Sequence, residues 1–255
     1  AKGVDRVSGL QFAPPAREVL AKASNKLLGG KFRFSPYREN LMTKGRDSLP
    51  RVVAIPTVRD RIILHQLKEC LAYAFPECVP KHVASVYVRN LAYEILGKPP
   101  ATTYVCGCDI KDFYGSIDRE RLLRIIGERI GHPITISLIR RSLLTPTVPS
   151  NARHPEYKRY LKERGIPQGL AISNILAAIY LREVDTAMEP FGVNYRRYVD
   201  DILMYGDEQS VRKAHKSLVA RLRHRKLSLH PLGSSKNYIS ALTTPFGYLG
   251  YYFRW

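Results

Sequence analysis

Two adjacent carboxylates, Asp200 and Asp201, stand between short runs of aromatic and branched apolar residues. The flanking runs predict two strands, and the acidic pair predicts the tight turn that joins them. Like charges at a hairpin tip repel each other, and neither side chain favours a strand interior. A divalent cation would compensate for this cost, whereas the simpler interpretation is a solvated turn that carries two acids.

A third carboxylate, Asp109, follows a β-branched, apolar and thiol-rich run from Thr102 to Cys108 that predicts a buried strand. Open α/β sheets place their chemistry at such strand ends. Further along, Asp118 precedes a helical pattern, and a helix cap explains it. Asp109 has no such explanation, so another reason is needed for an acid at this strand end.

Several elements must position these acids. A turn at Pro167–Gly169 precedes a helix over residues 173–188 that is apolar almost all round and therefore belongs in the core. An amphipathic helix is predicted over residues 207–225, and an aromatic hairpin over residues 246–253. Upstream, residues 31–38 alternate aromatic and basic side chains, which predicts a strand with one cationic side. With a second strand over residues 52–56, it forms either a phosphate-binding hairpin or a solvated edge.

Composition limits the kind of partner. The chain has 255 residues, of which 45% are hydrophobic, enough for a substantial core. Its 41 Lys and Arg residues against 22 Asp and Glu residues give a net charge of +19, which favours a polyanion such as nucleic acid. We find no apolar run long enough to span a bilayer and no signal peptide, so no membrane partner is expected. The start at Ala1 without Met, and the end directly after a strand-like run, suggest a processed or excised piece.

Four cysteines do not predict a disulfide framework at this length. Cys106 and Cys108 alternate along the predicted strand, so both side chains face the same side. A metal pair is one interpretation, but no matching Cys or His pair has zinc-ligand spacing, and buried free thiols are favoured. Free thiols indicate a reducing cytoplasm.

The order of these motifs resembles bacterial reverse transcriptases, a group that includes group II intron enzymes, retrons and abortive-infection or defence-associated enzymes. The resemblance covers nearly the whole chain. Upstream, Arg51–Arg61 resembles the fingers segment of intron enzymes, and Gly3–Asp5 resembles their N-terminal motif. The segment after Gly169 lacks a second small residue and a Pro after the Ser, and is closest to the defence-associated group. Motifs A to E of the family correspond in order to Asp109–Tyr114, Pro167–Asn174, Tyr198–Asp201, Lys236 and Phe246–Phe253.

The resemblance implies an α+β right-hand polymerase fold, in which an antiparallel palm sheet is backed by helices. Residues 1–100 are expected to form the fingers, together with some palm-connecting helix. Residues 101–255 are expected to form the palm, with a fingers insertion near residues 131–165. The thumb is expected to be absent or truncated.

The resemblance also implies RNA-directed DNA polymerase activity, in which a primer 3′-hydroxyl attacks a nucleotide α-phosphate with two Mg²⁺ ions bound. Mn²⁺ is an expected substitute. Asp109, Asp200 and the Ile110 carbonyl are the expected metal ligands, with Asp201 in a supporting role. Lys236 is the expected proton donor to the leaving pyrophosphate. The expected nucleotide-binding residues are Lys44, Arg51, Tyr114, Gln168 and Gly169, with Tyr114 beneath the sugar, and the expected primer or template contacts are Tyr198, Tyr248, Leu249, Gly250 and Tyr251.

Two alternatives remain open at this stage. The first is template-independent or RNA-synthesising nucleotidyl transfer on the same palm, although Val199 before the acidic pair favours DNA synthesis by resemblance. The second is a nucleic-acid-binding scaffold with vestigial catalysis, which the three convergent acids disfavour. The expected partners are an RNA template, a DNA or RNA primer and dNTPs, with noncoding RNA or protein subunits as further candidates. The expected setting is the bacterial cytoplasm, in either antiphage defence or a retroelement.

Overall fold

A computed structural model of the chain describes residues 1–43 and 50–254. The chain divides into two compact units, which are named here the first unit (Ala1–Pro76 and Ile117–Ile179) and the second unit (Glu77–Ser116 and Tyr180–Trp255). The fingers were expected to end at residue 100, whereas the second unit already begins at Glu77. The assignment of fingers and palm stays a prediction.

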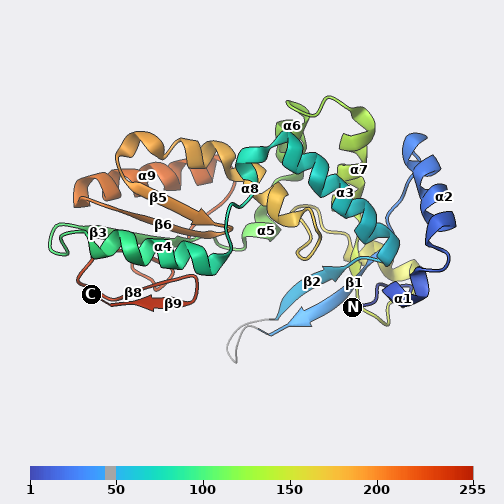
Figure 1. The fold of residues 1–255 in the computed structure, drawn as a ribbon, viewed down its shortest axis with the longest axis horizontal. Coiled ribbons are helices and arrows are strands. Elements are labelled where there is room, and N and C mark those ends of the chain that lie inside the picture. The colour runs from blue at the N-terminus through green and yellow to red at the C-terminus, as the bar shows by residue number, and fades with distance from the viewer. Residues whose placement is uncertain (44–49, 255) are drawn as a thin grey trace. The chain divides into compact units, whose positions relative to one another are not determined.

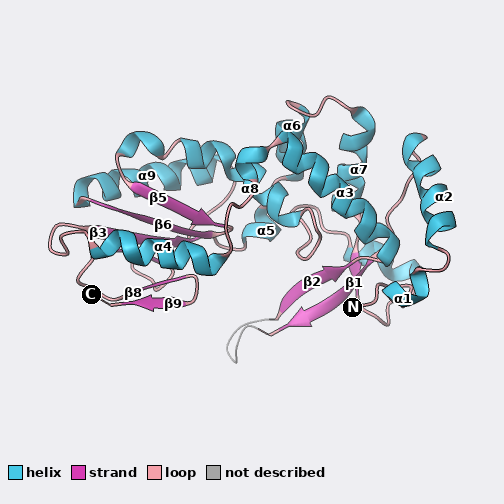
Figure 2. Ribbon diagram, viewed as in Figure 1, coloured by secondary structure: helices cyan, strands magenta, loops and turns pink. Residues whose placement is uncertain are grey.

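Helices predominate in the first unit (Figure 2). Its small sheet has the order β2-β1-β4, with β1 antiparallel to β2 and parallel to β4. Helix α8 and the 3₁₀ helix η1 both start in this unit and end in the second. The elements are α1 (Gly9–Phe12), α2 (Ala16–Leu28), β1 (Tyr37–Met42), β2 (Arg51–Ile55), α3 (Val58–Ala74), α6 (Arg119–Gly127), α7 (Pro133–Leu144), β4 (Thr147–Val148), α8 (Ser173–Thr186), and the 3₁₀ helices η1 (Pro76–Cys78) and η2 (His154–Tyr160).

The strand predicted over residues 31–38 is largely wrong, because β1 begins only at Tyr37. Side-chain contacts, and not hydrogen bonds to a neighbouring strand, fix the preceding residues 31–36. The buried rings of Phe32 and Phe34 pack edge to face with centroids 5.1 Å apart. The backbone N–H of Ser35 donates to the buried Asp60 carboxylate at 2.8 Å. The alternation of aromatic residues therefore reflects two rings that enter the core, a pattern that imitates a strand.

The second unit is built on a four-stranded sheet with the order β5-β6-β3-β7, and every neighbouring pair is antiparallel. This confirms the predicted antiparallel sheet. Figure 1 shows α9 on one face of this sheet and α4 on the other. The elements are α4 (Ala84–Leu96), β3 (Tyr104–Asp109), α5 (Phe113–Ser116), η3 (Glu189–Phe191), β5 (Asn194–Tyr198), β6 (Asp201–Gly206), α9 (Glu208–His224), β7 (Asn237–Ala241), β8 (Phe246–Tyr248) and β9 (Tyr251–Phe253).

The strand register assigns side chains to the two faces of this sheet. Val105 opposes Tyr205, and both join a buried cluster with Leu91 of α4 and Phe246 of β8. Because side chains alternate along a strand, Cys106 lies on the other face, toward α9. Asp109 shares the face of Val105, four residues further along β3.

Local sequence signals set the ends of several helices. The side chains of Thr57, Asp118 and Asp207 accept backbone N–H groups at the starts of α3, α6 and α9. The sequence pattern of residues 81–97 does not distinguish a helix from a strand, and the structure shows that this segment contains helix α4. In the described ranges, no helix combines the length and the apolar character that a bilayer crossing requires.

Candidate active site

The register of the central strands brings two of the predicted carboxylates together. Asp109 is the last residue of β3, Asp201 is the first residue of β6, and their Cα atoms are partners across the antiparallel pair. Directly opposed residues share a face of the sheet, with Cβ atoms about 4.5–5.5 Å apart. Both carboxylates therefore stand at the same end of the same face, which is a spacing that a bridging cation can use.

The acidic turn is displaced by one residue from its predicted position. Tyr198 pairs with Asp201, so Val199 and Asp200 form the two-residue turn and Asp201 belongs to β6. Val199 has φ of +59°, a left-handed conformation that costs a β-branched residue about 1–3 kcal/mol. Such strain persists only where surrounding contacts determine the conformation.

Arg197 supplies one of these contacts. Its Nη1 donates to the Val199 carbonyl at 3.0 Å, while Nε and Nη2 bind the two carboxylate oxygens of Asp185 at 2.8 and 2.5 Å. Burial alone would lower the pKa of Arg197, yet the hydrogen bonds and charge of Asp185 raise it above its usual value. The cation therefore stays charged and ties the turn to helix α8. No sequence pattern indicated this role for Arg197 or Asp185.

The Ile110 backbone faces the same turn. Its N–H donates to the Asp200 carbonyl at 3.3 Å, and Ile110 forms an isolated antiparallel bridge with Leu229. The N–H of Lys111 donates to the Ser228 carbonyl, away from the turn. Ile110 is thus adjacent to Asp200, as its predicted role as a backbone ligand requires.

Two basic side chains contact Asp109. Lys236 Nζ lies 3.0 Å from Asp109 Oδ2, and His230 Nε2 lies 3.6 Å from Oδ1. The Lys236 carbonyl also accepts the Asp109 N–H at 2.8 Å. The structure therefore brings Lys236 to the predicted acidic site. No sequence signal indicated the contact of His230 with Asp109.

Tyr114 lies in the short helix α5, directly after the strand that ends at Asp109. Its half-buried ring packs against the ring of Phe113 with centroids 5.5 Å apart. Upstream, Asp112 has φ of +42°, and its carboxylate occupies the space where a Cβ on Gly115 would lie, at 2.4 Å. Gly115 therefore allows Asp112 to fold over the helix backbone, which fixes the start of the segment that carries Tyr114.

The aromatic hairpin forms as predicted, but its tyrosines differ in exposure. Tyr248 pairs with Tyr251, and Leu249 and Gly250, at φ of +51° and +81°, form a turn of type I′. Tyr248 is only 5% exposed and joins the core, whereas Tyr251 is 52% exposed. The buried ring of Tyr248 offers no surface for base stacking, so a stacking contact at this hairpin falls to Tyr251. Tyr252, which was not among the predicted contacts, is 73% exposed.

Tyr198 is held beside the acidic turn by another ring. Its half-buried side chain packs edge to face against Tyr87 of α4, with centroids 5.7 Å apart. Further from the turn along the same two strands, Glu94 of this helix accepts a hydrogen bond from Tyr205 of β6 and pairs with Arg196 of β5. Helix α4 is therefore anchored along the hairpin by an aromatic contact and an ionic one.

The remaining predicted nucleotide contacts lie in the first unit. Gln168 accepts the Ala54 N–H on its carbonyl at 2.7 Å. Gly169 has φ of +97°, and a Cβ there would lie 2.5 Å from Val53 Cγ1 and 2.9 Å from the Ala54 carbonyl. This close approach to β2 is a structural reason for the glycine, beside the predicted approach of a nucleotide. Arg51 is exposed at the start of β2. Lys44 lies outside the described residues.

A buried arginine organises the loop before Gln168. The Arg119 guanidinium donates to the carbonyls of Gly165 and Lys162, both at 2.6 Å, and to that of Arg164 at 3.3 Å. Downstream, the Ser173 hydroxyl donates to the Pro167 carbonyl at 2.6 Å. Burial lowers the pKa of Arg119, and the three carbonyls solvate its charge. Arg119 is a second positioning residue that the sequence did not indicate.

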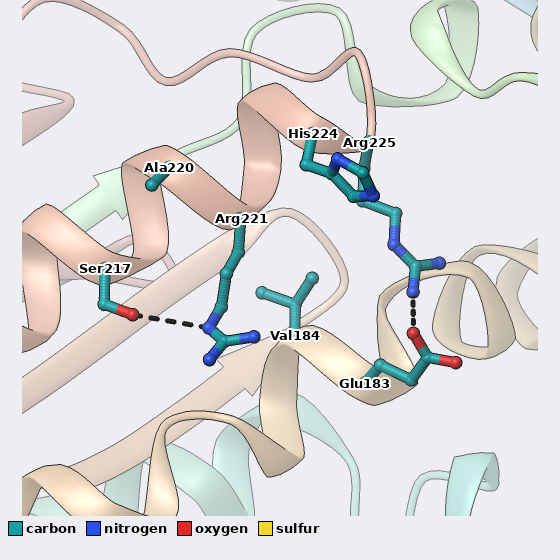
Figure 3. A pocket seen from close by; sticks show the side chains of 7 residues that line it. All are labelled: Glu183, Val184, Ser217, Ala220, Arg221, His224 and Arg225. Carbon is teal, nitrogen blue, oxygen red and sulfur yellow. Dashed lines mark hydrogen bonds and ion pairs between the residues drawn. The ribbon is translucent and has the colours of Figure 1, made fainter.

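One pocket of the second unit lies away from these residues. It has a volume of about 380 Å³ and lies between α8 and α9 (Figure 3). Arg221 donates to Ser217 at 3.3 Å, and Arg225 pairs with Glu183, so both guanidinium groups have protein partners. Its lining contains none of the predicted site residues that the structure describes. The candidate chemistry therefore belongs to the end of the sheet.

The donor set at the sheet end suits a hard cation. Asp109 and Asp201 supply carboxylates from adjacent strands, and Asp200 follows within the turn between β5 and β6. Hard divalent ions such as Mg²⁺ prefer carboxylate and carbonyl oxygens and retain several open positions for water or substrate. The residues therefore fit Mg²⁺, whereas the thiols of Cys106 and Cys108 lie on the opposite face of β3 from Asp109.

Comparison with known families gives one match over most of the chain. Residues 43–253 match the family described as "Reverse transcriptase (RNA-dependent DNA polymerase)". The match includes Asp109, Gln168, Asp200, Asp201 and Lys236.

Two curated proteins are similar to part of the chain. An "Uncharacterized 91 kDa protein in cob intron" of Schizosaccharomyces pombe is 27% identical over 181 residues, which are 68% of this chain and 21% of that protein. A "Putative COX1/OXI3 intron 1 protein" of Saccharomyces cerevisiae is 24% identical over 177 residues, which are 68% of this chain and 20% of that protein. The chain thus spans about a fifth of the length of these relatives.

Solved structures show the same fold at low identity. Telomerase from Candida albicans, in complex with a fragment of telomeric RNA, superposes with a TM-score of 0.60 at 13% identity over 94% of this chain and 48% of that one. Apo telomerase from Candida tropicalis superposes with a TM-score of 0.59 at 12% identity over 88% and 49% of the two chains. These likenesses confirm the predicted α+β polymerase fold.

Proposed function

Because this chain belongs to the reverse transcriptase (RNA-dependent DNA polymerase) family, we propose that it carries the catalytic centre of an RNA-directed DNA polymerase. The observation that carries the proposal is the pairing of Asp109 with Asp201 at the end of the central strands, with Asp200 in the adjoining turn. A nucleic-acid-binding scaffold would gain nothing from three acids at one sheet end, where their mutual repulsion is a cost.

The reaction joins the 3′-oxygen of a primer to the α-phosphorus of a dNTP and breaks the bond to pyrophosphate. Two Mg²⁺ ions, held by Asp109, Asp200 and the Ile110 carbonyl with support from Asp201, would stabilise charge on the attacking and leaving oxygens. The chain itself must orient these ligands. The bonds from Arg197 to the Val199 carbonyl and to Asp185 fix the turn, and the sheet register fixes Asp109.

Lys236 is assigned to proton transfer and charge balance near the site. Its Nζ contacts Asp109 at 3.0 Å and is about half exposed, so it can also reach a solvent-facing phosphate. An ammonium group at this place can donate a proton to the departing pyrophosphate. His230, 3.6 Å from the other oxygen of the same carboxylate, helps to hold Asp109 in one orientation.

The decisive experiment replaces one metal-binding carboxylate by a neutral amide of the same size. Asp200→Asn should reduce dNTP incorporation on a primed RNA template by roughly 10³-fold or more, because a metal ligand contributes several kcal/mol of charge stabilisation. Incorporation is measured with labelled dNTPs and Mg²⁺, and binding of the primer–template duplex is measured in parallel. Duplex binding should remain, since the change removes none of the 41 Lys and Arg residues that favour binding of a polyanion.

Asp207→Asn is the matched control. It removes the same charge in the same unit, and Asn also accepts the N–H of Ser210 that caps α9. Its incorporation rate should equal that of the wild type. Full incorporation by Asp200→Asn would refute the assignment of the metal ligands.

The same assay separates the finer alternatives. Incorporation without a template would favour terminal nucleotide addition, and preference for NTPs over dNTPs would favour RNA synthesis. The names of both curated relatives place them in introns, which supports a retroelement more than antiphage defence as the setting of this chain.

A further inference from the structure

Two buried thiols that the proposed reaction does not use lie beneath the candidate active site. Cys106 and Cys108 point to the α9 face of β3, with their Sγ atoms 3.4 Å apart. They are 0% and 4% exposed, so solvent contact does not account for their position. Cys108 is bonded through its peptide to Asp109, and its side chain points to the opposite face.

Helix α9 places an imidazole beside them. His215 is 8% exposed, and one of its ring nitrogens and both Sγ atoms lie within 4.8 Å of one another. The sequence separates His215 from Cys108 by more than a hundred positions, so the short-range spacing that marks many zinc sites could not reveal this group. Only the packing of α9 on the sheet brings it there.

A fourth polar atom borders the cluster. Asn237 Oδ1 lies 3.0 Å from His215 Nε2 and 3.5 Å from Cys108 Sγ. Its Nδ2 donates to the His230 carbonyl at 2.8 Å, which fixes the amide so that its oxygen faces the thiols. Asn237 is 2% exposed, so this oxygen is committed to the cluster.

We propose that Cys106, Cys108 and His215 bind a structural zinc ion, with Asn237 Oδ1 at the fourth position. Tetrahedral zinc with bonds of about 2.0–2.3 Å separates its ligand atoms by about 3.3–3.8 Å. Three separations in the cluster, of 3.0, 3.4 and 3.5 Å, lie near this range. The imidazole and both Sγ atoms lie within 4.8 Å of one another, so zinc binding would draw these ligands together by up to roughly 1 Å. Two thiolates and an imidazole select soft or borderline ions, in contrast to the oxygen ligands of the sheet end.

The ion would connect three elements that position the catalytic acid. Cys106 and Cys108 belong to β3, Asn237 begins β7, and His215 belongs to α9. Asp109 follows directly after Cys108, and Lys236 directly precedes Asn237. Zinc at this point stabilises the folded state, because the unfolded chain does not hold the ligands together.

Cobalt provides the direct test, because thiolate ligation to Co²⁺ gives a charge-transfer absorption that carboxylate ligation does not. The purified protein is stripped of metal under reducing conditions and titrated with Co²⁺. One equivalent should produce the thiolate band, and Zn²⁺ should abolish it. Zinc should also raise the midpoint of thermal unfolding.

Variants separate this site from other thiols and from the acids. Cys106→Ser with Cys108→Ser should lose the band and the zinc-dependent shift of the unfolding midpoint. Cys70→Ser, which changes an exposed thiol, should keep both, and so should Asp109→Asn. Absence of the band in the wild-type protein would overturn the proposal even where the double variant does not fold. A band that survives in the folded double variant would also overturn it.

Discussion

The predicted role of Tyr114 depends on the space that its ring occupies. Its ring is held by Phe113 in the short helix that follows Asp109. If the ring lies beneath the nucleotide sugar, it excludes the 2′-hydroxyl of a ribonucleotide. Tyr114→Ala should therefore raise the kcat/KM for an NTP relative to the matching dNTP by roughly 10–200-fold, the usual range for one excluded group.

The control for this prediction keeps the ring. Tyr114→Phe should leave the ratio of NTP to dNTP incorporation unchanged, because only the hydroxyl is lost. Equal ratios for the wild type and Tyr114→Ala would show that the ring serves the core and not the nucleotide.

The candidate site was only partly predictable from its residues. Acid residues in a hairpin indicated a metal site, and the sheet register places Asp201 directly opposite Asp109 at one end of the sheet. The predicted turn was wrong by one residue, because the register that pairs Tyr198 with Asp201 depends on the whole sheet. Arg197 and His230 were missed for the same reason, since their contacts span different elements and leave no local pattern.

Gly107 of strand β3 lies where a larger residue would clash with a neighbouring side chain. A Cβ on Gly107 would lie 2.4–2.5 Å from ring atoms of Tyr238, the residue directly opposite on β7. The Tyr238 hydroxyl donates in turn to the Gly247 carbonyl of β8 at 3.1 Å. Gly107→Ala should lower the free energy of unfolding by about 1–3 kcal/mol, the usual cost of overpacking. Chemical denaturation measures this change.

A double-mutant cycle identifies the cause. In a Tyr238→Ala background the added methyl group meets no ring, so Gly107→Ala should cost far less. Gly127→Ala is the control, because Gly127 ends α6 with no neighbouring atom within 4 Å of an added Cβ. An equal cost of Gly107→Ala in both backgrounds would exclude Tyr238 as the source of the strain.

Helix α4 is tied to the sheet by a titratable group. Burial alone would raise the pKa of Glu94, but hydrogen bonds from Tyr205 and Arg196 hold it below its ordinary value. On the other side, burial and the bond to Glu94 raise the pKa of Tyr205 to about 12. A lowered carboxyl pKa stabilises the folded state above the unfolded pKa, and this stability is lost as pH falls through the folded pKa.

Glu94→Gln should therefore unfold more easily than the wild type near pH 7. The difference should shrink as the pH falls below about 4.3, the ordinary pKa of Glu. Urea denaturation across this range measures it, and Glu163→Gln, at an exposed position, should show no such trend. If the difference in unfolding free energy between Glu94→Gln and the wild type does not change with pH, the loss of stability comes from packing and not from ionisation of Glu94.

Elements were predictable where the signal is local. The predicted cap at Asp118 located the start of α6, and apolar periodicity located α9 to within one residue at each end. The strand at residues 31–38 failed because buried rings and a strand give the same alternation. Residues 81–97 were ambiguous because burial against the sheet, and not propensity, decides in favour of α4.

The whole molecule carries a charge of +19, which should dominate its contact with nucleic acid. Neutralised phosphates release counterions, so affinity falls steeply with salt. The dissociation constant for an RNA–DNA duplex should rise by roughly 10³-fold between about 50 and 200 mM salt if six or more phosphates are contacted. Fluorescence anisotropy at a series of salt concentrations gives the slope, and a flat response would exclude a phosphate-dominated interface.

The sheet order has a consequence for how the acidic site can be lost. In the order β5-β6-β3-β7, the interior strands are β6 and β3, which carry Asp201 and Asp109. Fraying begins at the outer strands, and interior strands open only with the whole sheet. The arrangement of Asp109 and Asp201 should therefore survive local opening at β5 or β7 and be lost only when the whole sheet unfolds. Partial denaturation should then reduce the number of active molecules, while each molecule that remains folded keeps its full activity.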